Sequence, residues 1–298
     1  MIKIALFTGG TDSEREISLR SAKNVEQILN KQYTVAVFDY PKNWNDFLLK
    51  YKDYSVAVPV IHGKGGEDGE IQRKLDDINI PYLFSKPYVH ANAYNKYSTK
   101  QSVKSAGIKV PAGIKLWKGE SCTFPVPAVV KPSESGSSVG VTIVRKLDDY
   151  SKALELAFQH SHSVIVEEYI DGQEFTVGIV EIDGKNIALP VIMIKPKSGF
   201  FDFASKYNKE TLADEICPAP ISIELTEKLQ QIALKAHDAM GVKQLSRSDF
   251  MVNKDGEIYF LEINTIPGMT NTSLIPKALK TAGYDIEKVF AGWVESVK

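Results

Sequence analysis

Two apolar segments joined by Asp-Gly at positions 255–256 constrain this chain more than any other feature. Asp-Gly between such segments is a strong signal for a β-hairpin with a two-residue turn. With that turn, Asp249 lies directly opposite Glu262. Arg247 likewise lies opposite Asn264. Because side chains alternate between the two faces of a strand, all four side chains are expected to project from one face of the hairpin.

This face of the hairpin offers oxygen ligands. Opposed Cβ atoms lie roughly 4.5–5.5 Å apart, so Asp249, Glu262 and Asn264 could share cations. Such hard ligands suit Mg²⁺ held jointly with phosphate groups. An ordinary surface pair is the alternative, but two directly opposed acids repel each other without a cation. The hairpin therefore predicts a magnesium–phosphate site. The opposite, mostly apolar face is expected to be packed and carries Ser248, Phe250, Val252, Tyr259, Leu261 and Ile263.

The composition is that of an ordinary globular protein. Its 298 residues are 43% hydrophobic and 24% charged, with a net charge of -1. This balance gives no support for nucleic acid or a membrane as a partner. Cys122 and Cys217 lie far apart and are expected to be free thiols. Since no segment resembles a signal peptide or a transmembrane helix, the expected location is cytoplasmic.

The first part of the chain alternates between strand and helix patterns. Asp12 or Ser13 is the expected N-cap of the first helix. The alternation predicts a parallel, doubly wound domain. Strands are predicted at 2–8, 34–40, 55–61 and 81–84, and helices at 14–29 and 70–78.

The pattern changes after a predicted helix at 95–106. A compact α+β unit follows, with strands at 126–131, 140–145 and 163–169 and a helix at 149–158. A second hairpin turns at 183–184, and a helix at 225–240 precedes the hairpin that carries Asp249. Residues 196–216 show no sustained periodicity, which is typical of a loop that closes over a site or of disorder.

Lys131 precedes a loop of small residues, SGSSVG at 135–140. Small residues let backbone N–H groups approach phosphate oxygens, and the lysine adds positive charge. Alone, this loop is better interpreted as a plain turn, but beside a magnesium site it indicates a nucleoside triphosphate. Glu167 and Glu168 form either a solvated acidic edge or part of a nucleoside-binding linker, with Glu174 on the ribose. Both interpretations stay open at this point.

Seven ordered blocks resemble the D-alanine–D-alanine ligases of the ATP-grasp superfamily, along nearly the whole chain. They are GGTDSEREIS (9–18), HGKGGEDG (62–69), KPSESGSSVG (131–140), EEYIDGQE (167–174), DFASKY (202–207), RSD (247–249) and EINTIPGMTNTSL (262–274). The resemblance implies an α/β ATP-grasp fold. An N-terminal Rossmann-like parallel α/β domain at 1–90 would bind substrate. A central α+β ATP-grasp domain at 91–175 would precede a mixed α+β domain at 176–298, which would carry the magnesium site and a lid loop.

The resemblance also implies a reaction. The carboxylate of one D-alanine would attack the γ-phosphate of ATP, giving an acyl phosphate and ADP. The amine of a second D-alanine would then displace phosphate and give D-alanyl-D-alanine for peptidoglycan precursor synthesis. Two Mg²⁺ ions, for which Mn²⁺ can substitute, and lysines would neutralise the phosphate charge. The implied partners are D-alanine, ATP and a second copy of the chain in a homodimer.

The matching positions imply a role for each candidate site residue. The metal ligands would be Asp249, Glu262 and Asn264. The ATP-binding residues would be Lys96, Lys131, Ser138, Glu167, Glu168, Ile170, Glu174 and Lys206. The catalytic residues would be Glu14, Ser137, Tyr207, Arg247, Gly268 and Ser273. The remaining substrate-binding residues would be His62 and Leu274.

Within these sets, Glu14 would anchor the ammonium group of the first D-alanine with help from His62. Ser137 and Tyr207 would complete a hydrogen-bonded set with Glu14. Arg247 and the Gly268 N–H would stabilise the developing oxyanion. The carboxylate of the second D-alanine would bind Ser273 and the Leu274 amide.

Two alternatives remain. A relative that joins D-alanine to D-lactate would share most of these residues, although such enzymes tend to lack a tyrosine at the position of Tyr207. An ATP-binding protein without ligase activity would be expected to lack a magnesium ligand or Arg247, and this chain has them all. ATP-dependent phosphate release with a panel of D-amino acids and D-lactate discriminates among the three.

Overall fold

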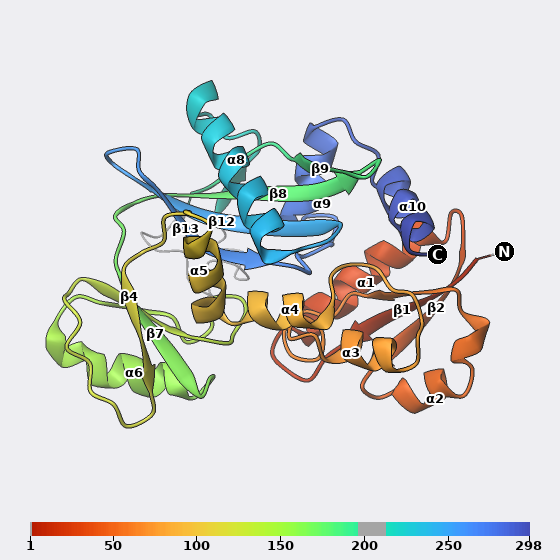
Figure 1. The fold of residues 1–298 in the computed structure, drawn as a ribbon, viewed down its shortest axis with the longest axis horizontal. Helices are drawn as coiled ribbons and strands as arrows, with labels where there is room; N and C mark the ends of the chain where they lie inside the picture. Colours follow the sequence, from red (N-terminus) through yellow and green to blue (C-terminus); the bar gives the residue numbers. More distant parts are fainter. Residues whose placement is uncertain (1, 196–212) are drawn as a thin grey trace.

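The computed structural model describes residues 2–195 and 213–298. The predicted site residues Lys206 and Tyr207 lie outside the described residues. Of the non-periodic stretch predicted at 196–216, only the end is described, and Asp214–Ile216 form a short strand, β11. These described residues fold around three separate β-sheets (Figure 1).

The N-terminal sheet is parallel, as predicted, with the strand order β2-β1-β3. Its strands are β1 (Lys3–Gly9), β2 (Thr34–Tyr40) and β3 (Val56–Pro59). The helices of this part are α1 (Arg15–Leu29), α2 (Trp44–Leu48), α3 (Glu70–Asp77), α4 (Pro87–Tyr94) and α5 (Lys96–Ser105), with a 3-10 turn η1 (Tyr51–Asp53).

The fourth strand predicted at 81–84 is wrong. Only Tyr82 bridges to Ala57. The chain then turns away because Phe84 adopts a left-handed backbone with φ of 76°. Helices α2 and α4 were not predicted, because they are too short to show a clear helical period.

The second sheet is antiparallel, with the order β4-β7-β5-β6. Its strands are β4 (Gly113–Trp117), β5 (Ala128–Pro132), β6 (Thr142–Val144) and β7 (Ser163–Glu168). Helix α6 (Tyr150–Phe158), which follows a 3-10 turn η2 (Leu147–Asp149), covers one face through Ala153 and Ala157. This is the predicted α+β unit, extended by β4.

The third sheet is also antiparallel, with the order β11-β10-β8-β12-β13 and with β9 beside β8. Its long strands are β8 (Gly172–Ile182), β12 (Leu245–Asn253) and β13 (Ile258–Asn264), and its short ones are β9 (Lys185–Ala188) and β10 (Ile192–Lys195). The helices that the structure describes in this part are α8 (Ile223–Met240), α9 (Leu274–Thr281) and α10 (Ile286–Val297). The domain division remains a prediction, but β8 would place its last boundary near residue 172, because one strand is not shared between two domains.

The hairpin β12–β13 has the predicted pairing at its functional end and a different turn. Asn253 pairs with Glu257, so the loop has three residues and not two, with Gly256 at φ of 80°. This moves the register near the turn by one residue, and Phe250 pairs with Phe260. A bulge at Leu261 restores the register, so Asp249 does face Glu262.

Because of this bulge, the predicted packing of β13 is wrong at Leu261. Phe260, rather than Leu261, is buried beneath the sheet, and its ring meets Phe250 edge-on with centroids 5.9 Å apart. Leu261 is only half-buried. Ser248, Phe250, Val252 and Ile263 are buried, as expected.

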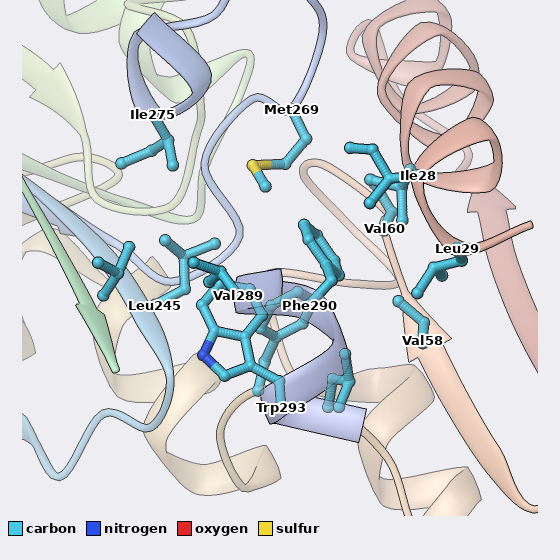
Figure 2. Close-up of a cluster of buried hydrophobic side chains, with 14 of the residues drawn as sticks. Ile28, Leu29, Val58, Val60, Leu245, Met269, Ile275, Val289, Phe290 and Trp293 are labelled. Atoms are coloured by element: carbon cyan, nitrogen blue, oxygen red, sulfur yellow. The ribbon is translucent and has the colours of Figure 1, made fainter. Parts of the chain in front are cut away.

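One apolar core joins the first and the third sheets. Figure 2 shows Trp293 and Phe290 of α10 between residues of the N-terminal sheet, such as Val58, and residues of the third sheet, such as Leu245. The indole N–H of Trp293 donates to the Glu181 carbonyl at 2.7 Å. Two ends of the chain are therefore held together by burial of apolar surface.

Within the described residues, no helix is both long and apolar enough to cross a membrane. Cys122 and Cys217 are free thiols, as predicted.

Trp293→Ala should lower the free energy of unfolding by about 3–5 kcal/mol, because it removes a 2% exposed indole from the shared core. Urea unfolding followed by circular dichroism measures this loss. Trp117→Ala is the matched control, since Trp117 is 53% exposed and should cost far less. Equal losses in the two variants would show that the core around Trp293 is not a main source of stability.

Candidate active site

One pocket of about 970 Å³ collects most of the predicted site residues. Its lining comes from the start of α1, the loops after β3 and β5, the hairpin β12–β13 and the segment leading into α9. The predicted residues in this lining are Glu14, His62, Lys96, Ser137, Glu174, Arg247, Asp249, Glu262, Asn264, Gly268, Ser273 and Leu274. Residues far apart in the sequence thus meet at one site.

The floor of the pocket is the hairpin, where Arg247 and Asp249 form a fork-shaped ion pair. Arg247 donates to both Asp249 oxygens, at 2.9 and 2.8 Å, and the hydroxyl of Thr176 donates to the same carboxylate at 2.5 Å. Burial by itself lowers the pKa of Arg247, but the charge and hydrogen bonds of Asp249 outweigh burial and raise it. The guanidinium therefore stays charged in a site shielded from water.

The other two predicted metal ligands contact groups across the pocket. The ammonium of Lys96 lies 3.4 Å from Glu262 Oε2. The Asn264 amide donates to Glu67 at 3.2 Å, and its oxygen accepts the Ile266 N–H at 2.8 Å. Backbone and side chains thus fix both ligands in place.

This donor set fits Mg²⁺. Asp249, Glu262 and Asn264 present oxygen atoms from one face, which is the ligand chemistry that Mg²⁺ takes together with substrate phosphates. In the part of the chain that the structure describes, no group of three or more His, Cys, Asp and Glu side chains could hold a metal. With two carboxylates, the hairpin suits ions completed by phosphate oxygens better than a closed, all-protein site.

Glu14 lies at the opposite wall, at the start of α1. It is 8% exposed, and burial together with the negative charge of Glu67 raises its pKa from 4.5 to about 7. Ser137 donates a hydrogen bond to it at 2.5 Å. The N-cap predicted at Asp12 or Ser13 is wrong, because Glu14 occupies that position. The Asp12 carboxylate instead accepts the backbone N–H groups of Glu14 and Lys64, and so ties two loops together.

In the small-residue loop, Gly136 lies directly against the Glu14 side chain. A Cβ atom at Gly136 would overlap the Glu14 carboxylate, so a larger residue here would displace that side chain. Ser137 and Ser138 both adopt left-handed backbone conformations, with φ of 52° and 59°. Lys96 donates to the Ser135 carbonyl at 2.5 Å and so connects this loop to the hairpin.

The remaining predicted ATP-binding residues lie outside the described lining of the pocket. Lys131 on β5 is half-buried beside the buried Glu167 on β7, with their charged atoms 3.0 Å apart. The Glu168 carboxylate accepts the Ala112 N–H at 2.8 Å and faces the start of β4. Ile170 is half-buried just beyond β7.

Lys100 was not predicted as a site residue. It pairs with one carboxylate oxygen of Glu167, and Lys131 pairs with the other. Burial lowers the pKa of Lys100 to about 8. Burial alone would raise the pKa of Glu167, but the two lysines outweigh it and lower it. Lys100 lies one helical turn after Lys96, and that spacing was the available signal.

Two further pocket residues had no predicted role. Glu67 lies 3.6 Å from His62 and accepts from Asn264, so it links the two walls of the pocket. It belongs to the block at 62–69, but its partners are distant in the sequence. Thr176 faces Asp249 across β8 and β12, and nothing in the sequence indicates that pairing.

The segment before α9 forms the last wall. The Ser273 hydroxyl accepts the Thr270 N–H at 3.0 Å and lies at the N-terminus of α9, beside Leu274. A Cβ atom at Gly268 would lie 2.9 Å from the Ser273 hydroxyl, so the backbone approaches this side chain closely. The positive end of the helix dipole thus faces a wall that could receive a carboxylate.

Comparisons with known proteins match nearly the whole chain to one family. A family model described as the D-ala D-ala ligase C-terminus matches residues 93–295. The D-alanine–D-alanine ligase of Maridesulfovibrio salexigens is 39% identical over 299 residues, which cover 98% of this chain and 97% of that protein.

Solved structures agree as well. The D-alanine–D-alanine ligase from Bacillus anthracis complexed with ATP is 31% identical, with a TM-score of 0.85 over 99% of this chain and 97% of that one. A D-Ala:D-Ser ligase from Enterococcus faecalis is 29% identical, with a TM-score of 0.84 over 99% of both chains. The predicted ATP-grasp fold is confirmed by this likeness.

The raised pKa of Glu14 predicts how stability depends on pH. The unfolded carboxyl ionises near 4.5 and the folded one near 7, so folding takes up a proton between these values. Stability relative to Glu14→Gln should therefore fall as the pH rises from 4.5 to 7, by about 3 kcal/mol, and then level off. Urea unfolding at several pH values measures the difference. Exposed Glu16 supplies the control, Glu16→Gln, and a Glu14→Gln difference that is independent of pH would contradict the raised pKa.

Proposed function

Because the chain belongs to the D-alanine–D-alanine ligase family, we propose that this pocket is where it joins two D-alanine molecules. The enzyme is an ATP-dependent ligase, which forms D-alanyl-D-alanine for peptidoglycan synthesis and converts ATP to ADP and phosphate. One observation supports the site assignment most strongly. Arg247, Asp249, Glu262 and Asn264 share one face of the hairpin and line the same pocket as Glu14.

The reaction has two steps. A carboxylate oxygen of the first D-alanine bonds to the γ-phosphorus of ATP while the bond to the ADP oxygen breaks. The amine of the second D-alanine then adds to the acyl carbon and loses a proton. The carbon–oxygen bond to phosphate breaks and the peptide bond is complete. Such phosphoryl transfer depends mainly on positioning and on neutralisation of charge.

Glu14 is the proposed anchor for the ammonium group of the first D-alanine. The carboxylate lies beside Glu67 and Asp12, so this wall of the pocket is electronegative. A bound ammonium would favour the ionised form of Glu14 and remove the repulsion that raises its pKa. Ser137 keeps the carboxylate oriented through its hydrogen bond.

Asp249, Glu262 and Asn264 are the proposed ligands of two Mg²⁺ ions, which Mn²⁺ can replace. When bound, the ions would neutralise the charge on the ATP phosphates and on the transferred phosphoryl group. Lys96, held between the small-residue loop and Glu262, is placed to contact the same phosphates. The roles of Lys206 and Tyr207 stay predictions from the sequence.

The oxyanion of the second step is proposed to form near Arg247 and the Gly268 N–H, because both line the pocket. The carboxylate of the second D-alanine would bind at Ser273 and the Leu274 N–H, where α9 begins. His62, buried between α1 and Glu67, would support the first substrate.

The nucleoside is proposed to bind beside the buried lysine–glutamate cluster. Lys131, Glu167, Glu168 and Ile170 come from β5, β7 and the segment after β7, and Ser138 lies in the loop that follows β5. Glu174 on β8 lines the pocket and would contact the ribose. We further propose that the enzyme is a homodimer in the cytoplasm, where ATP is available, and that the three segments bounded near residues 90 and 172 are its domains.

Transfer to D-lactate and ATP binding without ligation are the rival functions. Phosphate release from ATP should require D-alanine and Mg²⁺ together, and the product should be the dipeptide even when D-lactate is present. The measurement is phosphate release combined with mass analysis of the product. Equal rates with L-alanine, or without an amino acid, would exclude the ligase, whereas a depsipeptide product would favour the D-lactate alternative.

Glu262→Ala should reduce turnover at least a hundredfold, because it removes one of two carboxylates that hold the ions. Glu257→Ala is a matched control on the same hairpin. Glu257 is exposed, and its ion pair with Lys109 lies at the surface. Both variants should keep the circular dichroism spectrum of the parent. Near-normal turnover of Glu262→Ala in dilute magnesium would refute the metal assignment.

A further inference from the structure

Both backbone polar groups of Met269, the residue after Gly268, form hydrogen bonds with side chains of helix α1. Its N–H donates to the Ser21 hydroxyl at 3.2 Å. Its carbonyl accepts from the Asn24 side-chain amide at 2.7 Å. Ser21 and Asn24 are nearly one helical turn apart and so face the same side of α1. Although the partners are far apart in the sequence, both polar groups of the Met269 backbone bond to one helix.

The side chain of Met269 adds a third constraint. It is 1% exposed and lies in the core shared by the first and third sheets. Figure 2 shows it pointing toward Phe290 of α10 and lying beside Ile28 of α1. The residue is therefore fixed by two hydrogen bonds and by apolar packing, although it belongs to an irregular segment between β13 and α9.

Gly268 itself has no side chain that could hold it. It lines the pocket, and its neighbour Met269 is the nearest residue whose backbone is bonded to another element. A backbone donor to a developing oxyanion is effective only if it is already in place, and misplacement by about 1 Å can cost a hundredfold in rate. The position of the Gly268 N–H thus depends on what holds Met269.

We propose that Ser21 and Asn24 are positioning residues for the second step, because they clamp Met269 and so keep the Gly268 N–H directed at the oxyanion that develops on the acyl carbon. The proposal rests on the proposed function, in which that N–H stabilises the oxyanion. Neither residue lines the pocket. Their effect passes through the Met269 backbone.

Ser21 has a second partner, which the test must separate. Its hydroxyl lies 3.0 Å from His62 Nε2, so Ser21→Ala would also disturb the first-substrate wall. Among the described residues, the Asn24 side chain forms a hydrogen bond only with Met269, so Asn24→Ala isolates the clamp. Asn24 is also only half-buried, so its variant should fold even if Ser21→Ala does not.

The experiment compares Asn24→Ala and Ser21→Ala with two control variants, Lys23→Ala on α1 and Ser105→Ala on α5, both at exposed positions. Steady-state kinetics give kcat and the KM values for D-alanine and ATP. A second readout uses ATP labelled with ¹⁸O in the γ-phosphate and in the β–γ bridge. Reversible formation of the acyl phosphate scrambles the bridge label into the β-phosphate, whereas completion of the second step stops it.

If the clamp positions Gly268, Asn24→Ala should lower kcat about tenfold or more, with KM for ATP changed less than twofold. Scrambling relative to net turnover should rise by a similar factor, since the first step persists while the second slows. The two control variants should match the parent. A purely structural role would lower stability without changing this ratio.

Three results would overturn the proposal. One is a kcat for Asn24→Ala within twofold of the parent. Another is a lower kcat with an unchanged ratio of scrambling to turnover, which places the defect outside the second step. The third is an effect of Ser21→Ala without any effect of Asn24→Ala, which places the defect at His62. A parent enzyme that releases no phosphate with D-alanine would instead refute the proposed function.

Discussion

The pairing of β12 with its neighbours β8 and β13 determines where the charges of the pocket lie. Backbone hydrogen bonds place Asp249 opposite Glu262 on one side and opposite Thr176 on the other. A slip of one residue would turn the charged side chains into the apolar core and bring Phe250 to the pocket. Burial of Phe250 and Phe260 against each other therefore fixes the same register that the chemistry needs.

The two ends of the site carry opposite excess charge, and at each end burial shifts a pKa toward the uncharged form. Near α1, burial and the negative charge of Glu67 raise the pKa of Glu14 to about 7. Along α5 and β5, Lys100 and Lys131 share Glu167, and burial lowers the pKa of Lys100 to about 8. An ammonium group would relieve the first imbalance and phosphate groups the second, so the protein holds charges that its ligands complement.

The site depends on contacts between the beginning and the end of the chain. Helix α1 supplies Glu14 to the pocket and also bonds to Met269 beyond β13. The apolar core around Trp293 holds these segments together without any local sequence signal. Such long-range packing makes the geometry of the second step sensitive to residues, such as Asn24, that lie outside the pocket lining.

The sequence alone determined which residues we propose for the chemistry, because alternation along strands and the order of the motif blocks are local properties. It placed Arg247, Asp249, Glu262 and Asn264 on one face even though the turn has three residues, since the bulge at Leu261 compensates for the longer loop. Only the tertiary structure decided that compensation, the short bridge at Tyr82 and the pairing of Lys100 with Glu167. Each of these three features depends on backbone torsion or on burial between distant segments. None of them leaves a periodic pattern in the sequence.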